Sequence, residues 1–143
     1  MLTLMNYAQG EWVRGSGKTT DLFHAVTGEK IGEAGSGGLD FKSMAEFART
    51  VGGPALRALT FHQRAAMLKA IARHLMERKD AFYALSSMTG ATKADSWVDI
   101  DGGIGTFFAY SSRGRREFPN ETFHVEGPSE MLSKGGTFVG RHI

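Results

Sequence analysis

The sequence predicts an α+β fold in which β-hairpins come first, about four helices follow, and short strands close the chain. Aromatic and β-branched residues surround glycine turns in residues 1–39, and strand-like runs return in 117–143. Between them, apolar residues recur at helical spacing through 40–116. Because 143 residues is the length of one ordinary domain, we expect 1–143 to form a single segment.

Two strand pairs are expected near the N-terminus. The stretch 7–13 places aromatic and β-branched residues on both sides of Gly10, which predicts a tight β-hairpin. A second pair is expected between Thr20 and Ala34, with the turn at Thr27-Gly28.

Helical periodicity starts at Asp40, a suitable N-cap for a first helix that Gly52-Gly53-Pro54 is expected to end. Thr60 and Gln63 have the spacing of a capping box, in which each side chain bonds a free backbone amide of the other residue. This pattern predicts a second helix over about 61–78.

A third helix is expected to open at Asp80 and to stop at Gly90, and a fourth runs from Ala91 to near Gly114. The large apolar residues of the fourth helix are most simply core residues. They are Trp97, Ile104, Phe107, Phe108 and Tyr110.

The fourth helix carries three interior glycines, Gly102, Gly103 and Gly105. Each costs about 1 kcal/mol relative to alanine in a helix. Glycine in a helix has three possible structural reasons: it lets another backbone approach closely, it leaves space beside a ligand, or it marks a break in the helix. We therefore expect this helix to matter for function.

Three short strands are expected at the C-terminal end, over 122–125, 131–133 and 137–143, with Gly-Pro and Gly-Gly turns between them. The last strand reaches the final residue without a closing turn or a polar tail. Since an uncovered apolar strand promotes aggregation, we expect the sequence to be a fragment of a longer chain.

The composition disfavours several classes of protein. A net charge of +2 is too small to predict nucleic-acid binding, and the local cluster Arg113, Arg115 and Arg116 also suits a helix C-terminus. The absence of cysteine excludes disulfides, thiolate zinc sites and a cysteine nucleophile within these residues. No apolar run is long enough to predict a membrane span, so a cytoplasmic protein is expected.

Two apparent motifs lack what their chemistry requires. The run 15–20 (Gly-Ser-Gly-Lys-Thr-Thr) resembles part of a phosphate-binding loop, but Trp12 occupies the first glycine position and strand-like residues follow. The five histidines have no metal-ligand spacing, and we predict no metal site. No Gly-x-Ser-x-Gly elbow is present to support a hydrolase.

Three aspartates in the fourth helix are weighed as acid–base or cation-binding groups. Asp95 and Asp99 are four residues apart and share a face, whereas Asp101 points elsewhere. Acidic residues near a helix N-terminus also interact favourably with the helix dipole. We prefer this structural interpretation.

The order of elements resembles the N-terminal region of the aldehyde dehydrogenase superfamily, an α/β fold, and 10–12, 26–29 and 107–109 match its usual sequence features. Longer stretches, 52–61, 64–70 and 89–100, resemble the bifunctional proteins of phenylacetate degradation, and their benzoate-pathway relatives are the alternative. The resemblance spans essentially the whole chain.

The resemblance implies a full-length enzyme that uses NADP or NAD to oxidise a CoA-thioester semialdehyde to the acid in phenylacetate catabolism. A C-terminal hydratase-like domain would open the preceding oxepin-CoA ring. In such enzymes a cysteine thiolate attacks the aldehyde, hydride passes to the nicotinamide, and a glutamate activates water. The family places these groups after residue 143, so we assign no catalytic or cofactor-binding residue and expect the segment alone to be inactive.

The resemblance also implies a wall of the substrate tunnel, formed by two residues one turn apart on the fourth helix. Aligning on 98–101 gives Val98 and Gly102, and aligning on 107–109 gives Ser96 and Ile100. We prefer Val98 and Gly102, because the missing side chain at Gly102 would widen the tunnel for a bulky acyl-CoA chain.

The expected partners are the rest of the same polypeptide, a CoA-linked semialdehyde, and further copies in a homo-oligomer whose arm includes the strands of 117–143. No nucleic-acid or membrane partner is expected. The alternative is a complete helical binding or assembly module without catalysis. A folded, monodisperse monomer with a cooperative melt would favour that module, whereas aggregation or strand exchange would favour the fragment.

Overall fold

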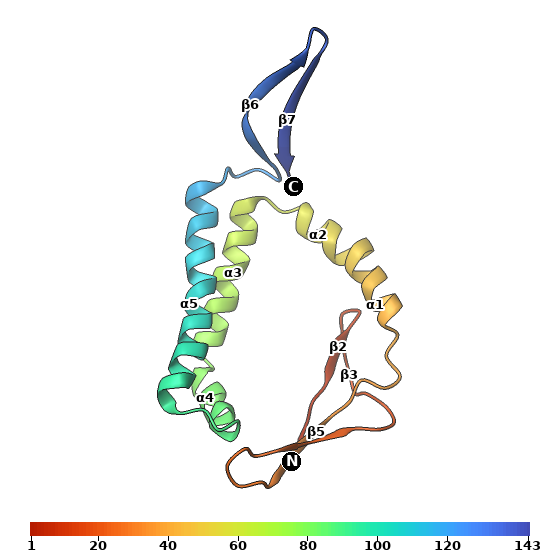
Figure 1. Ribbon diagram of the computed structural model, residues 1–143, viewed down its shortest axis with the longest axis vertical. Coiled ribbons are helices and arrows are strands. Elements are labelled where there is room, and N and C mark those ends of the chain that lie inside the picture. The colour runs from red at the N-terminus through yellow and green to blue at the C-terminus, as the bar shows by residue number, and fades with distance from the viewer. The chain divides into compact units, whose positions relative to one another are not determined.

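The computed structural model describes all 143 residues and confirms the α+β class (Figure 1). Five short strands precede the helices: β1 (Leu2–Thr3), β2 (Asn6–Ala8), β3 (Glu11–Val13), β4 (Thr20–Phe23) and β5 (Lys30–Ala34). The helical part contains α1 (Phe41–Phe47), the π-helical turn η1 (Ala48–Gly52), α2 (Gly53–Arg57), α3 (Phe61–Met76), α4 (Lys79–Met88) and α5 (Lys93–Glu117). Strands β6 (His124–Ser133) and β7 (Gly136–His142) follow.

The chain divides into two compact units, each made of two stretches of sequence. One unit contains Met1–Gly53 and Arg78–Asp101, and the other contains Pro54–Glu77 and Gly102–Ile143. The organisation into a single segment stays a prediction, as do the boundaries after residues 39 and 116.

The first unit contains both predicted N-terminal strand pairs. In β2–β3, Tyr7 lies opposite Trp12, and the two turn residues Gln9 and Gly10 have φ values of 54° and 93°. Positive φ at both positions is typical of the tight type I′ hairpin turn, which confirms the prediction. Strand β5 lies at the centre of a three-stranded sheet, parallel to β1 and antiparallel to β4.

The two glycines of the apparent phosphate-binding loop serve backbone purposes: Gly15 allows close packing, and Gly17 adopts a positive φ of 75°. The Ser16 amide donates to the Gly37 carbonyl at 2.7 Å, and a Cβ at Gly15 would overlap the backbone of Gly35. Strand β4 begins at Thr20, so no helix N-terminus follows the lysine to bind a phosphate. The structure therefore confirms that this run is a loop within a β region.

The helix boundaries follow the predicted caps with two corrections. Asp40 accepts hydrogen bonds from Ser43, and both hydrogen bonds of the capping box between Thr60 and Gln63 are present. The predicted stop at 52–54 is wrong, because helical structure continues through η1 and α2 to Arg57. Pro54 stands in the first turn of α2, the part of a helix in which proline is best tolerated.

Helices α4 and α5 also differ slightly from expectation at their starts. Helix α4 is preceded by Arg78, which makes no side-chain cap bond, and Asp80 lies in the first turn rather than at the cap. Gly90, with φ of 86°, follows the helix C-cap as predicted. Helix α5 then continues without a break through Gly102, Gly103 and Gly105.

The C-terminal part contains two strands instead of the predicted three. The Gly127-Pro128 pair lies inside β6 and produces an irregular register between Glu126 and Glu130. Gly127 has φ of 74°, a conformation that glycine adopts without strain in a bulge. The pair therefore bends one long strand instead of separating two.

The buried apolar residues belong to α3 and the second half of α5, which lie side by side (Figure 1). They are Ala65, Ala72 and Ile104. A Cβ at Gly114 would lie 3.1 Å from the Cβ of Ala65, so small residues set the close approach of the two helices.

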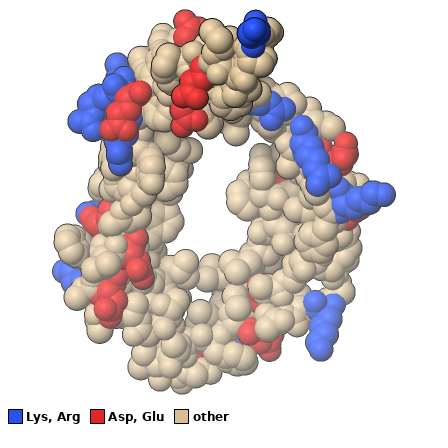
Figure 2. All heavy atoms as spheres, turned by 45° about the horizontal axis from the view of Figure 1, so that its top comes forward, with Lys and Arg blue, Asp and Glu red and all other residues tan.

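Of the five large side chains that the sequence placed in the core, one is buried, two are exposed, and Phe107 and Phe108 are half-buried. Trp97 and Tyr110 are 62% and 61% exposed, whereas Ile104 is buried as predicted. Charged side chains of both signs are interspersed on the face shown in Figure 2. Large apolar side chains as exposed as Trp97 and Tyr110 are typical of a face that contacts other protein.

Candidate functional site

The predicted tunnel residues Val98 and Gly102 lie on exposed positions of α5, one helical turn apart. Val98 is 62% exposed, and a Cβ placed on Gly102 would meet no atom within 4 Å. Both positions are therefore accessible to a ligand or to another protein segment. Their role as a tunnel wall stays a prediction.

The alternative pair, Ser96 and Ile100, faces the protein. Ser96 is 2% exposed, its hydroxyl donates to the Thr92 carbonyl at 2.9 Å, and it shares a hydrogen bond of 2.8 Å with Ser86 of α4. Ile100 is half-buried. Since Ser96 packs against α4, this register would direct one of its two residues away from any open channel.

The three aspartates of α5 do not form a carboxylate pair. Asp95 accepts hydrogen bonds from the Thr92 amide and hydroxyl at 3.2 and 2.6 Å, and its own amide donates to that hydroxyl. These bonds hold the pKa of Asp95 below its usual value. Asp95 therefore caps the helix, which confirms the structural interpretation.

Asp101 joins α4 to α5 by two short polar contacts. Lys79 Nζ lies 2.7 Å from one carboxylate oxygen, and the Tyr83 hydroxyl donates to the other at 2.6 Å. Lys79, followed by Tyr83, lowers the pKa of Asp101, and the bond to Asp101 raises the pKa of Tyr83 to about 12. The contact is an interhelical clamp, and its sequence signal was the i, i+4 spacing of Lys79 and Tyr83 on one helix face.

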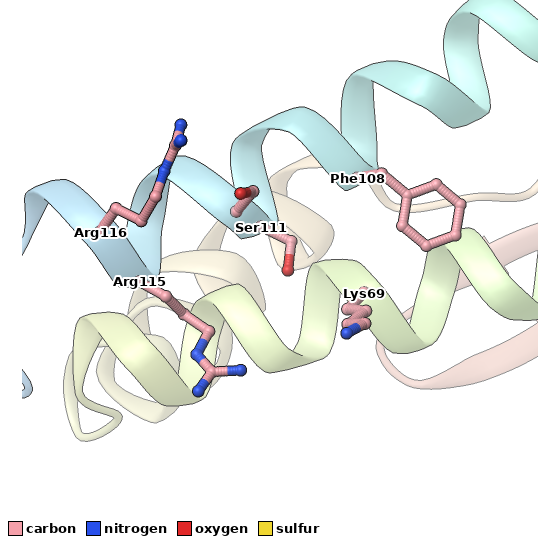
Figure 3. A pocket seen from close by; sticks show the side chains of 6 residues that line it. Lys69, Phe108, Ser111, Arg115 and Arg116 are labelled. Carbon is pink, nitrogen blue, oxygen red and sulfur yellow. The ribbon is translucent and has the colours of Figure 1, made fainter.

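Sequence reasoning missed a groove between α3 and the second half of α5, which we call the basic groove. Figure 3 shows Phe108, Ser111 and Arg115 on the side of α5 that faces α3, near Lys69. The cavity has a volume of about 480 Å³. Its lining residues are Lys69, Phe108, Ser111, Ser112, Arg115 and Arg116.

A sequence signal for the basic groove was present. Phe108, Ser111, Ser112 and Arg115 are spaced at i, i+3, i+4 and i+7, which places them on one face of a helix. The contribution of Lys69 from a separate helix had no such signal, because it depends on how α3 packs against α5.

The described residues contain no group of three or more His, Asp or Glu side chains arranged to hold a metal ion. None of the helices has the length and apolar character that crossing a membrane would require. Because the sequence has no cysteine, these residues also offer no thiolate nucleophile.

A family model described as "Aldehyde dehydrogenase family" matches residues 12–134 of this sequence. The chain belongs to the aldehyde dehydrogenase family. Membership is supported over the whole sequence by a curated relative from Aromatoleum evansii, described as 3,4-dehydroadipyl-CoA semialdehyde dehydrogenase. The two are 38% identical over 143 residues, which cover 99% of this aldehyde dehydrogenase chain and 28% of the relative.

The match confirms the predicted family and shows how much of a related aldehyde dehydrogenase this chain covers. It spans little more than a quarter of the relative's length, 28%. A match over this share of the relative does not by itself carry the relative's activity, substrate or partners to this chain. The chain's own contribution is a set of helices whose exposed positions include the predicted tunnel pair and the basic groove.

Proposed function

We propose that this chain is the N-terminal part of an NAD(P)-dependent aldehyde dehydrogenase that oxidises a CoA-thioester semialdehyde to the corresponding acid. The observation that carries the proposal is the 38% identity, sustained over essentially the whole chain, to a protein described as a CoA-semialdehyde dehydrogenase. The family match supports NADP or NAD as the oxidant. Phenylacetate catabolism is the pathway we propose on the sequence resemblance given above.

The proposed reaction converts aldehyde, water and NAD(P)⁺ into acid, NAD(P)H and a proton. A thiolate would add to the aldehyde carbon, hydride would leave that carbon for the nicotinamide, and water would release the acid from the acyl-enzyme. None of these groups lies within residues 1–143, so we expect the chain alone to be inactive. Its proposed role is to shape the path by which the substrate reaches them.

Within the proposed enzyme, Val98 and Gly102 would line that path. The support is geometric: both positions are exposed on α5, and Gly102 borders open space, whereas Ser96 of the alternative register bonds to α4. An acyl-CoA chain is bulkier than a small aldehyde, so a missing side chain at Gly102 matters more for the larger substrate.

Substitution at Gly102 in the full-length enzyme tests both parts of the proposal. Gly102→Leu should raise the KM for the CoA semialdehyde much more than the KM for a small aldehyde such as propanal. Gly103→Leu is the matched control, because Gly103 is equally open but lies about 100° further around the helix. Equal effects of Gly102→Leu on both substrates would reject the tunnel role. A wild-type enzyme that oxidises propanal but no CoA semialdehyde would reject the substrate class.

We also propose that the β6–β7 hairpin contributes to a homo-oligomer of the full-length enzyme. Its support is exposed apolar surface: Met131, Leu132 and Phe138 are 80%, 71% and 58% exposed. An isolated two-stranded hairpin is marginally stable in water, so it gains stability by covering such side chains. Sedimentation of the full-length enzyme should show dissociation by Leu132→Asp but not by Ser129→Asp, and an unchanged mass for both variants would reject this role.

A further inference from the structure

The cations of the basic groove lack acidic partners. Lys69, Arg115 and Arg116 make no ion pair, whereas Arg113 on the same helix bonds Glu117 at 3.1 Å. Some cations elsewhere in the chain, such as Lys79 with Asp101, pair with a carboxylate, whereas others, such as Lys42 and Arg57, do not. The positive charge in the groove is therefore uncompensated within the chain.

The helices that form the groove carry one acidic residue beside it, Glu117 at the end of α5, and Glu117 bonds Arg113. The sequence of α3, Phe61–Met76, contains no aspartate or glutamate, and α5 has none between Gly102 and Arg116. Clefts lined by charge of one sign raise the local concentration of ligands of the opposite sign. The groove is thus suited to an anionic ligand.

Ser111 provides a second, independent indication of a ligand. The residue is 3% exposed and lines the groove, and its hydroxyl makes no hydrogen bond within the chain. The other buried serine, Ser96, bonds both Ser86 and Thr92. No fully buried side-chain oxygen in the chain is left without a partner, so the Ser111 hydroxyl keeps access to the groove. A ligand oxygen there would satisfy it.

The mixture of groups narrows the chemistry of that ligand. Guanidinium and ammonium groups with hydroxyl donors are the usual partners of phosphate oxygens. Phe108 places an aromatic ring in the same groove (Figure 3), and such rings stack on planar bases. The volume of about 480 Å³ lies within the range of roughly 300–1,000 Å³ found for small-molecule sites.

We propose that the basic groove binds a phosphorylated adenine nucleotide, and that this nucleotide is the 3′-phospho-ADP end of the CoA thioester. The phosphates would contact Lys69 and Arg115 together with Ser111, and the adenine would stack on Phe108 (Figure 3). The choice of CoA rests on the proposed function, since the proposed substrate carries that group. NADP offers similar chemistry but bears its extra phosphate on the 2′ position, so the two sources can be separated.

Isothermal titration calorimetry of nucleotide binding to the full-length enzyme tests the site directly. The probes are 3′,5′-ADP, which matches CoA, and 2′,5′-ADP, which matches NADP. The double variant Lys69→Gln/Arg115→Gln should raise the Kd for 3′,5′-ADP by roughly tenfold or more, as expected for lost charge-assisted contacts. The control Arg113→Gln removes one charge from the same helix and should leave this Kd within about twofold. The variant Lys69→Arg/Arg115→Lys should restore binding, which separates loss of charge from loss of fold.

The outcomes distinguish the site, its ligand and the proposed function. The proposal is supported if the double variant loses 3′,5′-ADP binding while the control Arg113→Gln keeps it. The double variant should also show an increased KM for the CoA semialdehyde and unchanged kinetics with propanal. Loss confined to 2′,5′-ADP would overturn the choice of CoA. Equal Kd values for both probes in the wild type, the double variant and the control would overturn the site. If the wild type does not oxidise a CoA semialdehyde, the proposed function fails, while the calorimetric comparison still decides whether the groove binds the nucleotide.

Discussion

Replacing the three interior glycines of α5 by alanine should stabilise the isolated chain. The perturbation is the triple variant Gly102→Ala/Gly103→Ala/Gly105→Ala. At each of these positions an added Cβ would meet no atom within 4 Å, so neither a new contact nor a clash opposes the change. The intrinsic helix preference then decides, and alanine is favoured over glycine by about 0.8–1.0 kcal/mol at each helical position.

The expected gain in the free energy of unfolding is about 2–3 kcal/mol for the triple variant, because the three methyl groups have no shared partners and their effects should add. For a chain of this length, such a gain corresponds to roughly 5–10 °C in Tm. Urea denaturation, monitored by circular dichroism at 222 nm, measures this gain.

Gly114→Ala is the matched control, since it makes the same chemical change in the same helix. Its Cβ would lie 3.1 Å from the Cβ of Ala65, and overpacking of this kind costs about 1–3 kcal/mol, which cancels or exceeds the helix preference. A triple variant less stable than the wild type would refute the reasoning. Equal stabilisation by Gly114→Ala would refute the claim that the α3–α5 approach requires a glycine.

Two further substitutions test the capping and clamp contacts. Thr60→Ala should lower the free energy of unfolding by about 1 kcal/mol through loss of the capping box. The control Thr106→Ala loses only a hydrogen bond to its own helix and should change the free energy of unfolding by less than about 0.5 kcal/mol. Equal losses for the two variants in urea denaturation would contradict the capping role. Asp101→Asn should move the pKa of Tyr83, read from tyrosine absorbance, from about 12 towards the usual 10, and Asp99→Asn should not. Since the folded pKa of Tyr83 is raised, its contribution to stability is complete below about pH 10 and is lost as the pH rises through about 12. The folded pKa of Asp101 is lowered, so its contribution to stability is complete above the usual aspartate pKa. That contribution is lost as the pH falls through the lowered pKa of the folded state. A Tyr83 pKa that is the same in the wild type and in Asp101→Asn would exclude the clamp.

Local sequence chemistry predicted the elements whose signals are complete within a few residues. The capping box at Thr60, the hairpin turn at Gly10 and the helix stop at Gly90 all depend on backbone groups no more than four residues away. The Gly127-Pro128 pair misled the strand prediction, because the same residues suit a turn or a bulge. Only pairing with β7 distinguishes the two.

The aldehyde dehydrogenase family, the helical periodicity of α5 and the absence of a thiolate were all determined by the sequence alone. The tertiary structure decided which sides of α5 are used. It showed that Ser96 bonds to α4, that Gly102 borders open space, and that Lys69 meets Ser111 and Arg115 in one groove. The physical reason is that helical spacing fixes which residues share a face, whereas the neighbour of that face depends on packing between segments far apart in the chain.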